Sequence, residues 1–433
     1  MTHDPLSHGL WSASAPAGPA TQPLAEDIAA DVAIIGGGFT GCSSALHLAE
    51  GGASAVVLEA AEIGYGASGR NVGLVNAGMW VMPSVLKEEL EEPYGTRLLD
   101  VLGHGPSVVF DLVARLGIQC EAVHAGTLHC AVGRNGAAEV AERGRQWAAL
   151  GAPVEVLDAR KTAELVGSKT YCASLLDRRA GTIQPLAYVR GLASAALNAG
   201  AQIFTQTRVV RATQAGERWQ LTTGSGKTVS AKWVIVATDA YTGAAGLWSG
   251  IQAEQVQLPY FNLATVPLPS EVAASILPER QGAWDTCRVL SSFRFDAAGR
   301  MVVGSVGALR GTGKVIHQDW ARRAVQKIFP QLKDVRFEHA WYGTIGMTSN
   351  ALPRFHELAT NVLSFSGFNG RGIAPGTVFG RELARVILGE VKRDDLPLPM
   401  TPLVPVPWRG VRSLSYETGA QAVHLIGARG TTL

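Results

Sequence analysis

The chain has 433 residues, 47% of them hydrophobic, and its formal net charge is +2 at pH 7. This length allows more than one domain and a substantial core. Lysine and arginine form no basic stripe that would neutralise a row of phosphates. The composition therefore argues against nucleic acid as the partner and favours a small molecule.

The five cysteines show neither a Cys-x-x-Cys pair nor a Cys/His spacing, which predicts reduced thiols and no metal site. No apolar run approaches the roughly 18 residues of a membrane span. The amino terminus lacks the charged head and apolar core of a signal peptide. We therefore expect a cytoplasmic protein with no membrane span, and the composition leaves its oligomeric state open.

The first 29 residues are rich in Pro, Ala and Ser. Two alternatives fit this composition. The segment is either an arm that lies over the surface, with Leu10 and Trp11 as its anchor, or a disordered leader.

A glycine fingerprint follows the first predicted strand. Val32 to Ile35 are apolar, as in a strand buried on both faces of a parallel sheet. Gly36, Gly38 and Gly41 then fit G-x-G-x-x-G. In this pattern the first glycine allows a tight turn, the second lets backbone approach a pyrophosphate, and the third lets the next helix pack on the strand. The amino end of that helix would direct N–H groups and a positive dipole at phosphate.

A carboxylate at the expected distance strengthens this prediction. The second strand, 55–58, runs into Glu59, which lies 59 − 36 = 23 residues after the first glycine, where an acid can hydrogen-bond a ribose hydroxyl. A glycine-rich turn that binds nothing is the alternative. The order of strand, glycines, helix, strand and acid argues against it.

The segment 62–73 is a second glycine-rich region. Its glycines, together with Ser68, Arg70 and Asn71, suit a loop that wraps a diphosphate and the ring beyond it. An ordinary surface loop is the alternative. Its position directly after Glu59 favours the ligand-binding interpretation.

These two segments, G-G-G-F-T-G and G-Y-G-A-S-G-R-N-V-G, resemble the FAD-dependent oxidoreductases of the D-amino-acid oxidase superfamily, and within it the branch that includes gamma-glutamylputrescine oxidoreductase. The segment 10–14 (LWSAS) is also similar to an aromatic segment of that branch. The chain departs from the branch at Val72 and Leu74, where Gly and Gln are usual. The resemblance implies FAD as the cofactor and a substrate sheet that lies over the flavin.

The middle of the chain leaves the nucleotide fold and returns to it. Residues 85–150 are predicted to form helix, strand (126–132) and helix, as an insertion. A pattern of period 3.6 then predicts a helix from Gln184 that ends at Gly200. Strands are predicted at 201–204 and 207–210.

A buried strand is predicted from Trp233, and it ends in the small residues Ala237 and Thr238. The resemblance implies that backbone here passes close to the adenosine half of FAD. A central strand with a plain turn is the alternative.

Residues 250–335 form a second excursion. Alternating apolar and polar residues at 261–266, 288–295 and 301–304 predict antiparallel strands with one covered face. The segment 296–300 is a hairpin connection. This sheet is the expected substrate domain.

The strand 362–365 leads into the glycine-rich loop 366–376, after which a helix is predicted to start near Pro375. The positive amino end of this helix, together with Arg371, could stabilise the negative charge that reduction places on a flavin. A glycine-rich turn without a ligand is the alternative.

The expected fold class is α/β with an α+β substrate part: a Rossmann-like FAD-binding domain with an interleaved antiparallel-sheet substrate domain. The boundaries are the arm at 1–29, the FAD-binding domain at 30–84, 151–249 and 336–395, the substrate domain at 85–150 and 250–335, and an extended Pro-rich tail at 396–433.

The residues expected to bind FAD come from the glycine fingerprint, the acid, the two later loops and the strand ends. They are Gly36, Gly38, Phe39, Thr40, Gly41, Glu59, Ala60, Gly66, Ala67, Ser68, Gly69, Arg70, Asn71, Gly73, Leu74, Val209, Ala237, Thr238, Gly367, Asn369, Gly370, Arg371, Gly372 and Ile373.

The candidate catalytic residues precede the last loop. Trp341 and Tyr342 are the first candidates for pocket walls, with core packing as the alternative. His339 could act as a base, although a lone histidine more often has a structural role. Weaker candidates for the walls are Trp80, Tyr241 and Trp284.

Two further features bear on flavin attachment and substrate. Related sarcosine oxidases tether the flavin through a cysteine where this chain has Ala340, so the resemblance implies non-covalent FAD. Glycine oxidase-like members bind the substrate carboxylate with an arginine a few residues later, where this chain has the segment 345–347. This difference argues for an amine substrate, or for a carboxylate held elsewhere, for example by Arg294 or Arg354.

No second fingerprint directly follows a predicted strand, so no cradle for NAD(P)H is expected and the electrons should come from the substrate. The first functional reading is FAD-dependent oxidation of a C–N bond in an amine or amino acid, with hydride passing to the flavin, hydrolysis of the imine, and transfer of electrons to O₂ or another acceptor. The alternatives are a nicotinamide-driven flavin monooxygenase or reductase, and a nucleotide-binding scaffold without turnover.

Overall fold

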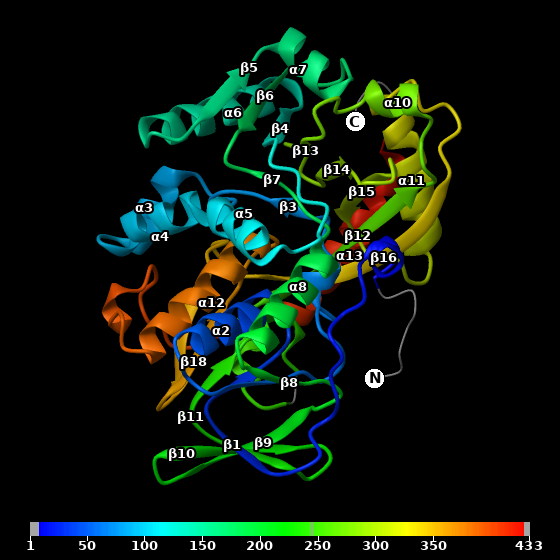
Figure 1. Ribbon diagram of the computed structural model, residues 1–433. Helices are drawn as coiled ribbons and strands as arrows, with labels where there is room; N and C mark the ends of the chain where they lie inside the picture. The colour runs from blue at the N-terminus through cyan, green and yellow to red at the C-terminus, as the bar shows by residue number, and fades with distance from the viewer. Residues whose placement is uncertain (1–7, 244–245, 428–433) are drawn as a thin grey trace.

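The computed structural model describes residues 8–243 and 246–427 (Figure 1). Within these ranges the chain forms two eight-stranded sheets and one two-stranded sheet. The first sheet lies at the bottom of Figure 1, and the second spans the top and right. Between them, at the left, lie the helices α3 (Pro83–Leu90), α4 (Tyr94–Gly103) and α5 (Gly105–Leu116).

The first sheet has the order β17-β18-β11-β1-β2-β8, and β9 and β10 extend it as a hairpin beside β11. The central pairs are parallel, which confirms the predicted Rossmann-like sheet. The strands are β1 (Ile28–Ile35), β2 (Ala55–Leu58), β8 (Gln202–Phe204), β9 (Val209–Ala215), β10 (Arg218–Thr223), β11 (Thr228–Val236), β17 (Arg354–Ala359) and β18 (Val362–Ser366).

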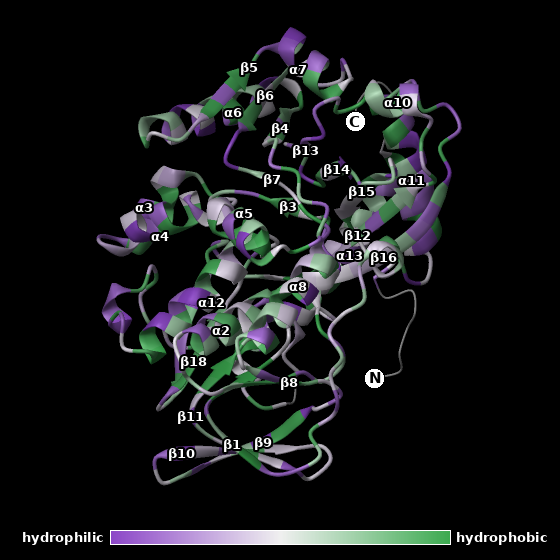
Figure 2. Cartoon of the chain, viewed as in Figure 1, coloured by the Kyte–Doolittle hydropathy of each residue, from purple (hydrophilic) through white to green (hydrophobic). Residues whose placement is uncertain are grey.

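Three helices pack together beside this sheet: α2 (Phe39–Glu50), α8 (Pro185–Asn198) and α12 (Ile373–Ile387). Glycine permits the closest contacts. A Cβ on Gly380 of α12 would lie 2.6 Å from the Thr40 carbonyl oxygen of α2, and one on Gly41 would lie 1.9 Å from the Gly36 carbonyl oxygen. In Figure 2 hydrophobic colour marks the strands near β11 and β18, whereas hydrophilic colour appears at β10 in the hairpin and on the peripheral turns.

The second sheet has the order β16-β12-β15-β14-β13-β4-β6-β5, and most of its neighbouring strands are antiparallel. Its helices are α6 (Gly133–Ala149), α7 (Ala159–Val166), α10 (Ser270–Ala274) and α11 (Gly313–Ile328). Its strands are β4 (Thr127–Ala131), β5 (Val154–Leu157), β6 (Ala173–Asp177), β12 (Val256–Thr265), β13 (Gly282–Asp285), β14 (Ser291–Phe295), β15 (Met301–Val306) and β16 (Phe337–Met347).

The pairing of three strands corrects the expected domain boundaries. β5 and β6, expected in the FAD-binding domain, extend the second sheet beyond β4. β16, also expected in the FAD-binding domain, pairs with β12 along its length. The residue pattern of a strand indicates which of its faces is buried, but its hydrogen-bonding partner is decided by segments far away in the chain.

The amino-terminal segment is an anchored arm over its described part, and the disordered-leader alternative is wrong there; residues 1–7 lie outside the described residues. The short helix α1 (Leu10–Ser14) buries Leu10 and Trp11 completely or nearly so. Trp11 meets Trp341 of β16 edge-on, with 5.4 Å between ring centroids. The arm therefore contacts both α8, beside the first sheet, and β16 of the second sheet before β1 begins.

The carboxy-terminal segment differs from the expected extended tail. Residues up to about 408 are irregular, and α13 (Arg409–Ile426) then packs on α11 and β12. The helix follows directly on the last of a series of prolines, Pro407, because residues after it are free of the restriction that proline imposes on helices. His424 of α13 is fully buried.

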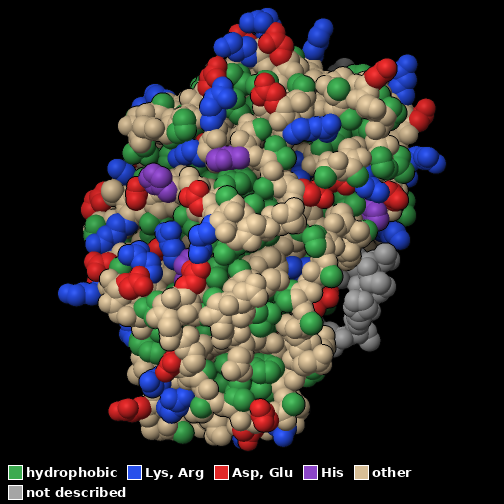
Figure 3. All heavy atoms as spheres, in the orientation of Figure 1, with side chains coloured by type: hydrophobic (Ala, Val, Ile, Leu, Met, Phe, Trp, Pro, Cys, Tyr) green, Lys and Arg blue, Asp and Glu red, His purple; other side chains and the backbone are tan. Residues whose placement is uncertain are grey.

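No helix in the described part of the chain combines the length and the apolar character needed to span a bilayer. On the face shown in Figure 3, acidic and basic side chains are interspersed, without a large region of one sign.

The remaining short elements are β3 (Leu74–Val75), which pairs with β7 (Gly181–Thr182), α9 (Gly250–Ala253) and the 3₁₀ turns η1 (Ala67–Gly69), η2 (Asp239–Tyr241) and η3 (Arg393–Asp395).

Candidate active site

A cavity of about 330 Å³ extends from the carboxyl ends of β1, β2 and β11 to the second sheet. We call its two parts the first-sheet side and the second-sheet side. The first-sheet side is lined by Gly36, Gly38, Thr40, Glu59, Ser68, Val209, Ala237 and Thr238. The second-sheet side is lined by Asn76, Trp80, Tyr260, Trp284, Leu290, Ser292 and Arg371.

The amino end of α2 is open to the cavity. Gly36 has a φ of +108°, which favours glycine, and turns the chain at the end of β1. Gly38 is the N-cap, and Phe39 and Thr40 line the cavity in the first turn. The Phe39 N–H donates to Ser68 Oγ at 3.0 Å, which joins this turn to the second glycine-rich loop. The helix end thus presents its unpaired N–H groups and positive dipole to the cavity.

Glu59 lies beside this turn, at the end of β2. Its carboxylate accepts hydrogen bonds from the N–H groups of Gly37 at 2.7 Å and Ala61 at 2.8 Å. Burial raises the pKa of the carboxyl group, and these two backbone donors oppose that shift. The acid is therefore held in place by backbone on both sides of the strand end.

The loop 64–73 is held both by hydrogen bonds within the loop and by hydrogen bonds from other parts of the chain. Asn71 Nδ2 donates to the carbonyls of Ala67 and Ser68, and its Oδ1 accepts from the Gly73 N–H at 2.9 Å. Trp11 Nε1 of the arm donates to the Asn71 carbonyl at 2.8 Å. Trp341 Nε1 and Asn262 Nδ2 from the second sheet each donate to the Arg70 carbonyl at 3.0 Å. The loop is therefore held by three separate parts of the chain.

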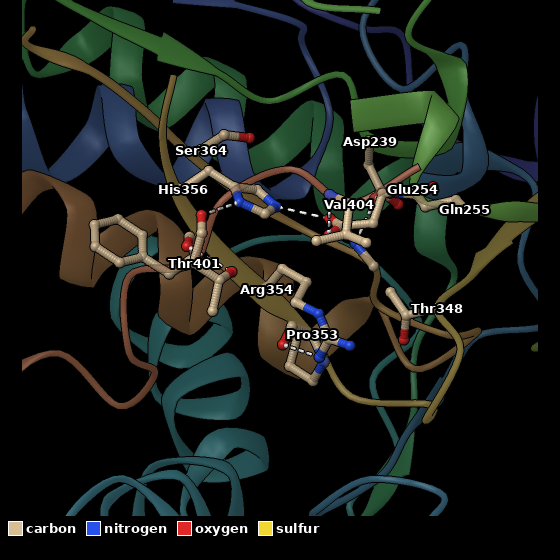
Figure 4. Close-up of polar contacts among 12 residues, drawn as sticks. Asp239, Glu254, Gln255, Thr348, Pro353, Arg354, His356, Ser364, Thr401 and Val404 are labelled. Atoms are coloured by element: carbon tan, nitrogen blue, oxygen red, sulfur yellow. Dashed lines mark hydrogen bonds and ion pairs between the residues drawn. The ribbon is translucent and has the colours of Figure 1, made fainter. Parts of the chain in front are cut away.

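The loop 366–373 carries the second helix end, since Gly372 is the N-cap of α12 and both Gly372 and Ile373 line the cavity. Asp239 fixes the start of this loop: its Oδ1 accepts from the Gly367 N–H at 2.7 Å and from Gln255 Nε2 at 2.8 Å. Burial raises the pKa of Asp239. Asp239 and Gln255 are among the residues drawn in Figure 4.

A buried contact between His356 and Glu254 lies next to this region. Figure 4 shows His356 of β17 directed at Glu254, with 2.9 Å between Nε2 and Oε2. His356 Nδ1 lies 2.8 Å from the Thr401 carbonyl, and Glu254 Oε1 accepts from the Val404 N–H at 3.2 Å. The irregular carboxy-terminal segment is thereby joined to β17 and to the residue before Gln255.

The predicted cofactor residues lie together around the cavity, with four exceptions. Gly41, Gly69, Gly73 and Gly367 do not line it. Each instead permits a close contact, because an added Cβ would lie within 2.4 Å of a neighbouring atom. Of the weaker wall candidates, Trp80, Tyr241 and Trp284 all line the cavity.

The three candidate catalytic residues do not line the cavity, which corrects the prediction that placed them there. Trp341 is 2% exposed and packs on Trp11, so the core-packing alternative holds for it. Tyr342 packs against the Phe261 cluster, and His339 lies 3.8 Å from Glu338. The strand β16 reaches the cavity one residue later, at Gly343, because the arm and the loop 64–73 occupy the space beside Trp341.

Several lining residues were not predicted from the sequence. Asn76 follows β3, and Tyr260 of β12 lies 2.7 Å from Ser292 of β14, between hydroxyl oxygens. No local motif marks them, since they meet only through strand pairing.

The arginines considered for a carboxylate lie elsewhere: Arg294 donates to the carbonyls of Phe295 and Ile183, and Arg354 to Asn350 and two carbonyls.

The residues present fit FAD. The helix ends of α2 and α12 line one cavity, so two electron-rich groups of an elongated ligand can each meet a positive dipole. Glu59 lies next to the first of these ends, within reach of a ribose. The backbone comes close to the cavity at Gly36, Gly38, Gly370 and Gly372, where no side chain stands between it and a ligand.

Comparison with known proteins agrees with this geometry. The family model "FAD dependent oxidoreductase" matches residues 31–386. The chain is 33% identical to gamma-glutamylputrescine oxidoreductase of Escherichia coli, over 86% of this chain and 87% of that protein. It is 24% identical to glycine oxidase of Bacillus licheniformis, over 83% and 93% of the two chains.

Solved structures show the same fold at lower identity. Glycine oxidase from Bacillus cereus has a TM-score of 0.70 at 19% identity, covering 87% of this chain and 99% of that one. L-proline dehydrogenase from P. horikoshii has a TM-score of 0.69 at 18% identity, covering 86% and 96%. The cavity, its two helix ends and the match along the chain lead to one conclusion: the chain belongs to the FAD-dependent oxidoreductase family of D-amino-acid oxidase type.

Proposed function

We propose that this FAD-dependent oxidoreductase oxidises a C–N bond in a small amine or amino acid. The observation that carries the proposal is the continuity of the cavity, which joins a dinucleotide-type strand edge to a side lined by Trp80, Trp284 and Tyr260. Relatives named gamma-glutamylputrescine oxidoreductase and glycine oxidase support this class of substrate. FAD, when bound, would supply the acceptor for a hydride from the carbon next to the amine nitrogen, and water would then hydrolyse the imine.

The chain itself holds and orients the reactants. The amino end of α12 directs its dipole to the region between the two sides of the cavity, where negative charge is stabilised. The aromatic residues Trp80, Trp284 and Tyr260 exclude water from the second-sheet side. Asp239 lies just after β11 and accepts a hydrogen bond from the Gly367 N–H. This bond holds the loop before α12 close to the end of β11.

The surroundings favour the neutral form of a bound amine. Arg70, Arg208 and Arg371 line the cavity, and positive charge together with desolvation lowers the pKa of an amine. No histidine lines the cavity among the described residues. We therefore expect the rate of reduction to rise with pH, as more of the substrate loses its ammonium proton before it is oxidised.

We infer that FAD is bound without a covalent link. Ala340 packs with the Phe261 cluster, and none of the five cysteines is among the described residues that line the cavity. Acid precipitation should release all of the yellow colour into the supernatant. Flavin that stays on the denatured chain would contradict this inference.

The test of the function is anaerobic bleaching of the bound flavin by a panel of amines and amino acids, with NADH and NADPH as the matched comparison. Reduction by at least one amine, and slow or no reduction by either nicotinamide, is expected because one dinucleotide fingerprint leaves no cradle to orient a nicotinamide. Fast reduction by a nicotinamide and none by any amine would favour a monooxygenase or reductase.

The unpaired cysteines support a cytoplasmic location.

A further inference from the structure

Helix α13 turns its polar side toward the protein and its apolar side outward. The inward residues recur every three or four positions and are Ser413, Glu417, Ala420, Gln421 and His424. The four polar ones have atoms 2.7 to 3.2 Å from partners on β12 and in the segment 310–317, namely Gln257, Arg310, Thr312 and His317. A helix that covers a protein core normally has the opposite arrangement, with its apolar side inward.

The outward side of α13 carries a concentration of exposed apolar side chains. Of the fifteen large hydrophobic residues that are exposed in the described part of the chain, seven belong to this helix or its N-cap. We call them the apolar patch: Trp408, Val411, Leu414, Tyr416, Val423, Leu425 and Ile426. Trp408 is 81% exposed and Ile426 is 74% exposed. A grouped apolar surface of this kind marks an interaction site.

The charged residues of this region leave an excess of arginine. The segment 396–426 contains the acid Glu417 and the cations Arg409 and Arg412. Glu417 is turned inward, where its carboxylate is paired with Arg310. Neither Arg409 nor Arg412 takes part in an ion pair with a described residue. Both lie in the first turn of α13, where a cation does not stabilise its own helix, so their charges remain available to another molecule.

The neighbouring helix α11 does not supply a free carboxylate. Figure 1 shows α13, in red, beside β12 and α11. The single acid of α11 is Asp319, which is paired with Arg323. Two cations of α11, Lys314 and Arg322, are exposed. In the described structure, therefore, neither helix presents an unpaired acid beside the apolar patch.

We propose that the outward side of α13 docks on an anionic lipid surface. The apolar patch would enter the boundary between headgroups and acyl chains, as the apolar side of an interfacial helix does. Arg409 and Arg412 would meet the anionic headgroups, and Trp408 and Tyr416 are of the residue types that favour this boundary. The cytoplasmic leaflet of a membrane carries such lipids.

A second copy of the chain fits this surface less well. It would bring two further arginines to the contact and no unpaired carboxylate from α11 or α13. The inference also goes beyond the proposed function, because the described residues that line the cavity include none from α13.

The experiment measures binding of the FAD-loaded enzyme to two kinds of vesicle. One kind is phosphatidylcholine alone, and the other is phosphatidylcholine and phosphatidylglycerol in equal parts. Flotation separates bound from free protein, and flavin absorbance shows that the bound protein is the holoenzyme. Binding to the anionic vesicles should be at least about tenfold tighter than to the neutral ones, and added salt should reduce this ratio.

Two variants separate the apolar contribution from the charge. Val411→Glu places a carboxylate in the apolar patch and should weaken binding to anionic vesicles at least about tenfold. Arg412→Gln should weaken it about fivefold and leave binding to neutral vesicles unchanged. The matched controls are Val210→Glu in β9 and Arg134→Gln in α6, both at exposed residues, and they should bind as the wild type does. Flavin content and thermal unfolding report whether each variant is folded.

Each contrary outcome overturns the proposal. Equal binding to the two kinds of vesicle, or binding to neither, rejects an anionic lipid surface. A dimer in sedimentation that Val411→Glu abolishes, without binding of the wild type to vesicles, assigns the apolar patch to a second copy. Equal losses in Val411→Glu and Val210→Glu would show that α13 is not the contact. Reduction of the flavin by amines is measured without vesicles, so the proposed function stands or fails separately.

Discussion

The two sides of the cavity are built in different ways. The first-sheet side is made of short continuous segments, 36–40, 59–61 and 65–68, which include several glycine and alanine residues. The second-sheet side is made of single side chains such as Trp80, Trp284 and Arg371 from segments far apart in the sequence. A ligand is held on the first side by the path of the chain and on the second by side chains.

This difference has a consequence for substitution. Backbone can approach a ligand only where glycine or small residues keep the space open, so the first-sheet side depends on residue type at a fixed spacing. A side chain on a paired strand can change without moving its neighbours' backbone. The first-sheet side should therefore be the less tolerant of the two, and the following predictions test this.

The largest effect is expected for Gly41→Ala. The added Cβ would lie 1.9 Å from the Gly36 carbonyl oxygen, which forces α2 away from β1. We expect a loss of roughly 3 kcal/mol or more of unfolding free energy, typical of severe overpacking, together with loss of FAD. Denaturant unfolding and flavin content measure both. Gly419→Ala in α13, where nothing lies within 4 Å, is the control and should keep both, so equal behaviour of the two variants would contradict the argument.

A smaller effect is expected for Glu59→Ala. The change removes the acceptor of the Gly37 and Ala61 N–H groups as well as the expected ribose contact. FAD binding should weaken by roughly 1 to 3 kcal/mol, the cost of unpaired donors. Fluorescence titration of apoenzyme with FAD measures this. Glu59→Gln keeps one acceptor oxygen and should lose less; an unchanged dissociation constant in both variants would show that the ribose acid lies elsewhere.

Low pH should destabilise the packing of α11 against α13 rather than the first-sheet side of the cavity. His317 of α11 and His424 of α13 are both fully buried, with 2.7 Å between their Nδ1 atoms. Burial lowers the pKa of His317 to about 4 and that of His424 to about 3. The unfolded chain binds these protons below about pH 6.5 whereas the folded chain does not. Stability is therefore fully present above pH 6.5 and is lost as the pH falls toward 4.

The expected slope is at most roughly 1.4 kcal/mol per pH unit for each histidine that titrates. Urea unfolding between pH 7 and 4.5 gives this slope, and hydrogen exchange of residues 409–426 shows whether α13 is released first. The variant His424→Gln should have a shallower slope, whereas His104→Gln, which changes an exposed histidine, should not. Equal slopes in both variants would show that other groups govern acid unfolding.

The smallest effect is expected for Trp284→Leu on the second-sheet side. Trp284 lines the second-sheet side of the cavity, so the variant removes part of its aromatic wall together with a contact of roughly 0.5 to 1 kcal/mol to the guanidinium of Arg371, and substrate binding should weaken about threefold. The FAD dissociation constant should not change, which distinguishes the two sides. Trp408→Leu, at a residue that is 81% exposed, is the control. Loss of FAD in Trp284→Leu would contradict the distinction between the first-sheet and second-sheet sides of the cavity.

The sequence by itself determined the first-sheet side. Gly36, Gly38 and Gly41 at their spacing, followed by a strand that ends in Glu59, predict the turn, the helix end and the acid that the structure contains. These features are local, because each depends on backbone conformation within a few residues. The hairpin at 296–300 was predictable for the same reason, and the helix that was predicted to start near Pro375 begins two residues earlier, at Ile373.

Tertiary structure decided most of the second-sheet side, although Trp80 and Trp284 were among the wall candidates taken from the sequence. Trp341 has the residue type and the position in the chain that a pocket wall requires, yet it packs on Trp11, which lies 330 residues earlier (341 − 11 = 330). Trp80, Trp284 and Arg371 meet because three separate segments converge, and β5, β6 and β16 take their places through pairing with distant strands. Local periodicity specifies which face of a strand or helix is buried, whereas the partner that covers this face is selected by packing over the whole chain.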